Sequence, residues 1–185
     1  MAILIILLPL LFVMAPSISL GQEVPRFDLF GGYSYLRLDT PSIGFADFSN
    51  LNGFNAGAAV NLTGGWAVVA DASGHYGSRL DAYNFMAGPQ YSWRKERSRF
   101  FAQVLFGKAQ NTVHIATQTQ NGFESVGRAI AAGGGFDLDV THRFTFRVVQ
   151  ADYLNTHTFN NSQNNIRVST GLVVHFGHIG KRRKP

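Results

Sequence analysis

The chain has 185 residues, no cysteine and a formal net charge of +5 at pH 7. This length favours a single domain, and the lack of cysteine excludes disulfides, Cys-based metal sites and a thiol nucleophile. Half of the 16 basic residues lie in two short segments, 94–99 and 181–184. A nucleic-acid surface would instead interleave basic and aromatic residues across one face, so we expect no nucleic-acid partner.

The chain begins with an apolar run from Ala2 to Val13, and Ser19 and Gly21 lie at the −3 and −1 positions of a cleavage before Gln22. This pattern is typical of a secretory signal peptide. The alternative is a short membrane anchor, although a spanning helix needs about 20 apolar residues. We expect three parts, namely a signal peptide (1–21), one domain (22–178) and a basic tail (179–185).

After this leader, the sequence alternates between apolar and polar residues in eight segments separated by Gly, Asn, Ser and Thr clusters. Such alternation predicts strands, and no helical periodicity extends beyond two turns. The predicted strands span about 27–39, 52–62, 66–76, 82–93, 99–110, 126–140, 143–154 and 164–176. The predicted fold class is all-β. Eight is also the smallest usual strand number of a closed antiparallel up-and-down transmembrane β-barrel.

The segment GWAVVADASGHYG (65–77) shows how the two faces of a strand differ. Trp66, Val68 and Tyr76 share one face, whereas Asp71 and His75 share the other. A soluble strand buries its apolar face, but a barrel strand in lipid turns that face outward. The polar faces of the other strands are rich in Gly, Ala, Ser and Asn, a poor composition for a soluble core. We therefore expect the polar faces to fill the lumen of a small barrel.

Two groups of residues follow from this assignment of faces. The predicted polar network of the lumen consists of Asp71, His75, Asp137, Asp139, Arg147, Asp152, Arg167 and His175. The predicted aromatic residues at the lipid interfaces are Trp66, Tyr76, Tyr83, Tyr91, Trp93 and Phe176. Aromatic residues at strand ends are typical of the two membrane interfaces. A three-residue turn at 141–143 would also place Asp137 directly across from Arg147, on the same face.

Two strands fit the alternation less well. In the first strand, Phe30 and Leu36 fall on the face assigned to the lumen. In the seventh strand, the apolar residues change parity, which predicts a β-bulge near Val148 and Val149. With that bulge, Arg147, Gln150 and Asp152 would all remain inside the barrel.

The connections alternate in length, being short after the second, fourth and sixth strands (TGG, RKERS and THR). Longer loops are predicted at 40–50, 111–125 and 155–163, and the short link GSRLD between the third and fourth strands is the exception. Short turns on one side and long loops on the other are typical of outer-membrane barrels. We therefore expect the turns and both termini to lie in the periplasm.

Several segments carry a family resemblance: FDLFGGYSYLRLD, NGFNAGAAVNLTGGWAVVADASGHYG, AAGGGFDLDVTHRFTFRVVQADYL and IRVSTGLVVHFG. They resemble the small eight-stranded outer-membrane barrels related to outer-membrane protein A and the wider porin-like set. The resemblance implies a bacterial outer-membrane location and contact with outer-membrane lipid and lipopolysaccharide. It also implies insertion by the barrel-insertion machinery, with Phe176 resembling the aromatic end of the final strand. The tail GHIGKRRKP departs from that signal, and no peptidoglycan-binding activity is expected.

Catalysis has weaker support in the sequence. His75, Ser78 and Asp81 lie close together in the chain, but a nucleophile needs an oriented base within hydrogen-bond reach. The His-x-Ser pair of lipid A deacylases has only His157-Thr158-Phe159 as a counterpart. The glycines at 133–135 lack the Gly-Lys-Ser/Thr of a phosphate loop, and the six histidines show no metal-ligand spacing. We expect no catalytic site, metal or cofactor.

The sequence thus predicts a monomeric, non-enzymatic outer-membrane barrel with a lumen filled by side chains. Its role would be structural or would depend on surface contacts made through the loops. Two alternatives remain open at this point. One is a lipid A-modifying enzyme, either an acyltransferase or a deacylase, and the other is a soluble exported lipid-binding barrel.

Overall fold

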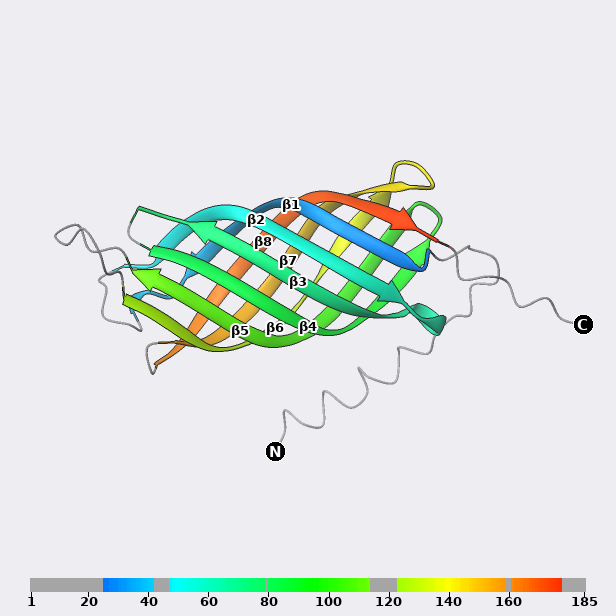
Figure 1. The fold of residues 1–185 in the computed structure, drawn as a ribbon. Helices are drawn as coiled ribbons and strands as arrows, with labels where there is room; N and C mark the ends of the chain where they lie inside the picture. The colour runs from blue at the N-terminus through cyan, green and yellow to red at the C-terminus, as the bar shows by residue number, and fades with distance from the viewer. Residues whose placement is uncertain (1–24, 42–46, 79, 114–122, 159–160, 178–185) are drawn as a thin grey trace, which may run out of the picture.

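The strands of this chain close into a barrel in the computed structural model, which describes residues 25–41, 47–78, 80–113, 123–158 and 161–177 (Figure 1). The strands are β1 (Phe27–Leu38), β2 (Ser49–Asn61), β3 (Trp66–Tyr76), β4 (Leu80–Lys95), β5 (Ser98–Val113), β6 (Phe123–Asp139), β7 (Phe144–Thr158) and β8 (Asn161–Phe176). Each pairs antiparallel with its neighbours in the chain, and β8 pairs with β1 to close the sheet. The predicted eight-stranded up-and-down barrel is confirmed.

One end of the barrel, here called the turn end, holds the short connections together with the start of β1 and the end of β8 (Figure 1). Between β2 and β3 lies the single turn η2 (Thr63–Gly65), where Gly64 and Gly65 adopt positive φ angles of 72° and 85°. Between β6 and β7, the Val140 amide donates to the Phe144 carbonyl at 3.0 Å. The predicted register of Asp137 opposite Arg147 is confirmed.

The predicted turn at 94–98 is too long, because β4 continues to Lys95 and β5 begins at Ser98. Only Glu96 and Arg97 remain between the two strands, and Glu96 has a positive φ of 51°. Arg99, predicted as the first residue of the fifth strand, is the second residue of β5 and points into the lumen.

At the opposite end, called the loop end, the predicted loops are also shorter than expected. Most of 155–163 is strand, since β7 runs to Thr158 and β8 starts at Asn161. Asn, Thr and Ser residues favour loops, but here Asn155 Nδ2 donates to Asn164 Oδ1 across the strand pair at 3.0 Å. Of the predicted loop at 111–125, residues 111–113 belong to β5 and 123–125 to β6, and the last two residues of 40–50 belong to β2. Residues 42–46 and 114–122 lie outside the described residues. The predicted signal peptide and basic tail lie outside them too.

The predicted bulge in β7 is confirmed. Val148 and Val149 both face outward, with 37% and 40% of their surfaces exposed, while Arg147 and Gln150 are buried. The register with β6 and β8 shifts at this point. Thr170 of β8 donates its hydroxyl to the Arg147 carbonyl at 2.9 Å, which satisfies a backbone acceptor beside the bulge.

The outer wall is apolar around the whole circumference. Residues from every strand expose large apolar side chains, including Leu29, Phe54, Val68, Phe85, Val104, Ile130, Phe146 and Leu172. A soluble protein would not expose so continuous an apolar surface. A barrel in lipid requires it, because its strands present their apolar faces to hydrocarbon.

Among the described residues, no helix is long and apolar enough to cross a membrane.

Candidate functional site

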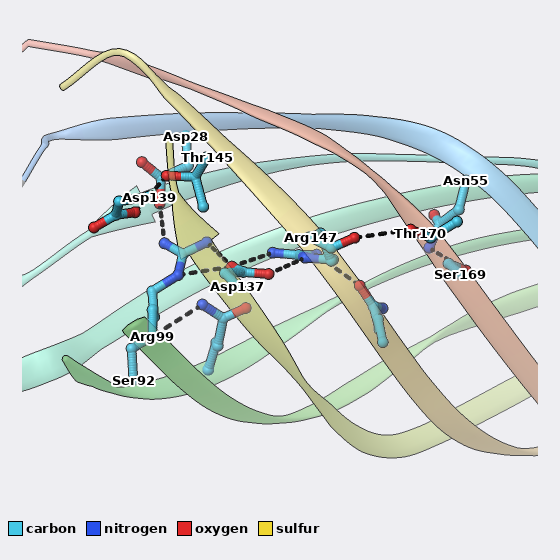
Figure 2. A network of polar contacts seen from close by, with 12 residues as sticks. Asp28, Asn55, Ser92, Arg99, Asp137, Asp139, Thr145, Arg147, Ser169 and Thr170 are labelled. Carbon is cyan, nitrogen blue, oxygen red and sulfur yellow. Dashed lines mark hydrogen bonds and ion pairs between the residues drawn. The ribbon is translucent and has the colours of Figure 1, made fainter. Parts of the chain in front are cut away.

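The polar network of the lumen is the candidate site, and Arg99 of β5 lies at its turn-end side (Figure 2). Arg99 is 2% exposed. Its Nη1 donates to Asp28 Oδ2 at 2.8 Å, and its Nε donates to Asp137 Oδ2 at 2.8 Å. Asp28 belongs to β1, across the lumen from β5, so this one guanidinium ties together strands that do not pair in the sheet.

Arg147 of β7 extends the network from the same carboxylate. Its Nε donates to Asp137 Oδ1 at 2.9 Å, and its Nη1 donates to Gln150 Oε1 at 2.6 Å. The guanidinium carbon lies 4.3 Å from the ring centroids of both Phe30 and Phe101. Stacking of this kind stabilises a desolvated cation. It also explains why Phe30 occupies a lumen position, which the alternation alone left unexplained.

Arg167 of β8 completes the network towards the middle of the barrel. It donates through Nη2 to Asp152 Oδ2 at 2.8 Å and through Nη1 to Asp71 Oδ1 at 2.7 Å. Gln150 Nε2 also donates to Asp152 Oδ2 at 2.8 Å, which joins this part to Arg147. A continuous chain of hydrogen bonds between charged side chains, bridged by the neutral Gln150, therefore runs from Asp28 to Asp71.

A shorter branch lies at the turn end. His175 Nδ1 is 2.7 Å from Asp28 Oδ1, and its Nε2 is 2.7 Å from the Thr145 hydroxyl. Thr145 in turn donates to Asp139 Oδ1 at 2.5 Å. The structure thus joins seven of the eight residues predicted for the network, counting Asp71, Asp137, Asp139, Arg147, Asp152, Arg167 and His175.

The eighth, His75, is fully buried but lies in a separate cluster nearer the loop end. Its Nε2 is 2.8 Å from Ser34 Oγ, and Ser169 donates its hydroxyl to Ser34 at 2.9 Å. Beyond this cluster, the lumen becomes apolar on one side. The buried side chains there are Leu36, Leu38, Leu51, Leu80 and Ala82. This apolar cluster explains why Leu36 lies on the lumen face of β1.

Sequence reasoning missed Asp28, Arg99 and Gln103 as members of the network, and it placed Gln150 inside the barrel without assigning it to the network. Gln103 donates to Asp152 Oδ1 at 2.9 Å, and the contacts of Asp28, Arg99 and Gln150 are given above. A signal was present for Arg99, because it shares parity with the polar Gln103 and Asn111 along the fifth strand. The lumen position of Arg99 was missed because the other charged residues of 94–99 suggested a turn.

The described part of the charged network encloses a small cavity. Asp28, Arg99, Arg147 and Gln150 line a cavity of about 20 Å³ together with their neighbours. A volume of about 10–15 Å³ accommodates a single water molecule, so this cavity has room for about one. A soluble lipid-binding barrel needs an apolar interior large enough for a lipid, whereas charged and amide side chains line much of this cavity.

The predicted interface aromatics all lie on the outer wall, in two groups. Trp66, Tyr91, Trp93 and Phe176 lie near the turn end, where the rings of Trp66 and Tyr91 are 5.0 Å apart. Tyr76 and Tyr83 lie near the loop end, with their ring centroids 5.8 Å apart.

The structure does not assemble the sequence-based catalytic candidates into one site. His75 contacts Ser34 inside the barrel, whereas Ser78 is exposed beyond the end of β3. His157 contacts a residue of the next strand instead, with its Nδ1 3.2 Å from Ser162 Oγ. Within the described ranges, no group of three His, Cys, Asp or Glu side chains could hold a metal ion.

The fold is thus a small, closed eight-stranded β-barrel with an apolar outer wall and a polar, hydrogen-bonded lumen. No protein-family model matches the chain. No curated protein matches its sequence either.

Among solved structures, Neisserial surface protein A is similar with a TM-score of 0.65 and 11% identity, over 84% of this chain and 100% of that one. Ail, the attachment invasion locus protein of Yersinia pestis, has a TM-score of 0.54 and 15% identity, over 80% and 98% of the two chains. The N-terminal barrel domain of Pseudomonas aeruginosa OprF has a TM-score of 0.51 and 12% identity, over 82% and 99%. At these identities, the likeness establishes a shared fold.

Proposed function

We propose that this chain is a non-enzymatic, monomeric barrel of a Gram-negative outer membrane that acts through its loop end, either in envelope structure or in surface contacts. The observation that carries the proposal is the filled lumen inside an apolar outer wall. Arg99 pairs with Asp28 and Arg167 pairs with Asp71 across the barrel, so ion pairs inside the lumen link strands that are not neighbours in the sheet. Neither transport of large solutes nor storage of a lipid fits such an interior, which leaves the exposed ends for function.

Fractionation of cells tests the location, together with gel mobility of boiled and unboiled membrane samples. A folded barrel in the outer-membrane fraction is expected to change mobility on boiling. Recovery of the protein in the soluble periplasm would contradict the proposal.

In the proposed orientation, the turn end and both termini face the periplasm. Trypsin added to intact cells should then leave the turn at Glu96 and Arg97 uncut, while the same turn is cut after the outer membrane is permeabilised. Cleavage at Arg97 in intact cells would reverse the orientation.

A surface-contact role is supported by one structural neighbour, because Ail has been solved in complex with the heparin analogue sucrose octasulfate. For the present chain, we propose contacts made by residues 114–122, the segment of the sequence between β5 and β6. The test is binding of barrel-expressing cells to immobilised heparin, with a variant whose residues 114–122 are replaced by a short Gly-Ser turn. Equal heparin binding by cells with equal levels of the wild type and of the variant would contradict a role of residues 114–122 in surface contacts.

The contact between His157 and Ser162 favours a second candidate function, hydrolysis of a lipid ester at the membrane surface. Both residues face outward near the loop end, as a lipid-acting nucleophile and base would have to. Mass spectrometry of lipid A from cells that express the wild type or Ser162→Ala distinguishes this candidate. The leading proposal expects identical lipid A from both strains, and a product that disappears with Ser162→Ala would replace it.

A further inference from the structure

Two basic side chains lie directly opposite each other on the lipid-facing wall. Lys108 of β5 is the register partner of Arg128 of β6, and both are exposed. Directly opposed residues have Cβ atoms about 5 Å apart, and like charges at such positions destabilise a sheet. The arrangement is therefore unfavourable unless an anion lies between the two side chains.

Among the described residues, no acidic side chain forms an ion pair with Lys108 or Arg128. The nearest acids in register are Asp81 and Glu124, which both align with Thr112. Thr112 lies four residues beyond Lys108 along β5, roughly 13 Å away. Glu124 also accepts a hydrogen bond from Gln110 Nε2 at 2.8 Å.

The height of the pair on the wall indicates what the anion is. On each strand, the outward residue two positions nearer the turn end is a large apolar side chain, Phe106 with 55% and Ile130 with 45% of its surface exposed. Towards the loop end, the next outward residues are the polar Gln110 on β5 and Val126, 58% exposed, on β6, and Glu124 follows Val126. Lys108 and Arg128 thus stand near the loop-end border of the apolar band, where lipid headgroups meet the barrel. Arg and Lys are the side chains that bind phosphate best, with charge-assisted hydrogen bonds.

We infer that Lys108 and Arg128 form a binding site for the phosphate group of a membrane lipid in the leaflet at the loop end. The inference rests on the proposed outer-membrane location, and it adds a specific lipid contact to it. His157 faces Arg128 from β7 and borders the site on the side away from Lys108. The bound phosphate would offset the repulsion between the two cations and fix the height of β5 and β6 in the membrane.

The probe is lipid A with its phosphates intact, compared with chemically dephosphorylated lipid A, in phosphatidylcholine nanodiscs that hold the full-length mature protein. Native mass spectrometry measures the dissociation constant of each lipid. The wild type should bind the phosphorylated form more tightly. Lys108→Gln and Arg128→Gln should each weaken that binding about fivefold, as expected for one basic residue at a membrane surface.

Arg37→Gln is the matched control, because Arg37 is also exposed near the loop end but stacks on the Phe48 ring at 4.6 Å. Its effect should stay below about twofold. An equal loss in Arg37→Gln would mean that only total charge matters, which overturns the site. Inorganic phosphate at the same concentration should not displace the lipid, and displacement would assign the pair to free anions.

Lys108→Glu is the second variant, for use if the neutral variants fold poorly. It places a glutamate opposite Arg128, so the two side chains can form an ion pair. This variant should insert normally and lose the preference for phosphate. Retention of the preference would overturn the inference. Insertion into nanodiscs without lipid A, measured by the change of gel mobility on boiling, tests the membrane barrel separately from the phosphate site. An inserted wild type without phosphate preference defeats this inference alone, whereas failure to insert defeats the proposed function as well.

Discussion

The inner and outer faces of the same strands are stabilised in different ways, and β3 illustrates the contrast. Its inner residues Asp71 and Ser73 are 6% and 2% exposed and both accept hydrogen bonds from Arg167. Its outer residues Trp66 and Val68 are each 52% exposed and face the surroundings of the barrel. An inner side chain thus depends on one specific partner, whereas an outer side chain depends on the polarity of the medium. The two faces should therefore respond to different substitutions.

The largest effect is expected inside, at Arg99. Arg99→Ala removes the partner that Asp28 and Asp137 share and leaves buried carboxylates undercompensated. Breaking a buried ion pair costs about 3–5 kcal/mol, which should appear in urea unfolding of the barrel in phosphatidylcholine vesicles. Arg97→Ala, in the exposed turn two residues away, is the control and should change the free energy of unfolding by less than about 0.5 kcal/mol. Similar losses in the two variants would contradict a buried role for Arg99.

On the outer face, a charge in the middle of the apolar band should be the costly change. Val68→Arg should lower the free energy of unfolding in vesicles by about 2–4 kcal/mol. Val126→Arg is the matched control, because Val126 is also outward but lies beyond Arg128 towards the loop end. A residue outside the hydrocarbon should tolerate arginine at a cost of about 0–1 kcal/mol. If the two arginines cost the same, β3 does not present this face to lipid.

A glycine pair tests the tightness of the inner packing. A Cβ atom at Gly135 would come within 2.5 Å of the Val149 carbonyl oxygen and within 2.6 Å of the Phe101 ring, which stacks on Arg147. A Cβ at Gly31 on the outer wall would meet nothing within 4 Å. Overpacking of this kind costs about 1–3 kcal/mol, so Gly135→Ala should be clearly less stable than the wild type. Gly31→Ala should unfold at the wild-type urea concentration or above it. A neutral Gly135→Ala would indicate a looser lumen than the one described.

The smallest effects are expected for coupling energies in double-mutant cycles. The inner pair Asp137 and Arg147, with Nε and Oδ1 2.9 Å apart, should show a coupling of about 1–3 kcal/mol between the two alanine substitutions. The outer pair Tyr33 and Asn52, where the phenol donates to Oδ1 at 2.5 Å, should show about 0.2–1 kcal/mol between Tyr33→Phe and Asn52→Ala. Additive losses at the inner pair would remove the contrast between the faces.

The sequence was sufficient for the strand number, the two faces and the contact between Asp137 and Arg147. The faces follow from a period of two, and the contact follows because a tight turn fixes the register of adjacent strands. The bond from Arg99 to Asp28 could not be derived in this way, because it joins β5 to β1 across the lumen and depends on how the sheet closes. The ends of β7 and β8 were missed for a related reason. Pairing around the closed barrel keeps Asn155 and Thr156 in strands although their residue types favour loops.

The central claim is that the polar face lies inside and the apolar face meets lipid, and a spin-label scan of β3 tests it most directly. The chain has no cysteine, so single cysteines at 66–76 can each carry one nitroxide. Electron paramagnetic resonance in vesicles then measures collision with oxygen, which concentrates in hydrocarbon. Oxygen accessibility should alternate with a period of two, high at Val68, Ala70 and Ala72 and low at Val69 and Ser73. High accessibility at Val69 and Ser73, or no alternation along the strand, would contradict it.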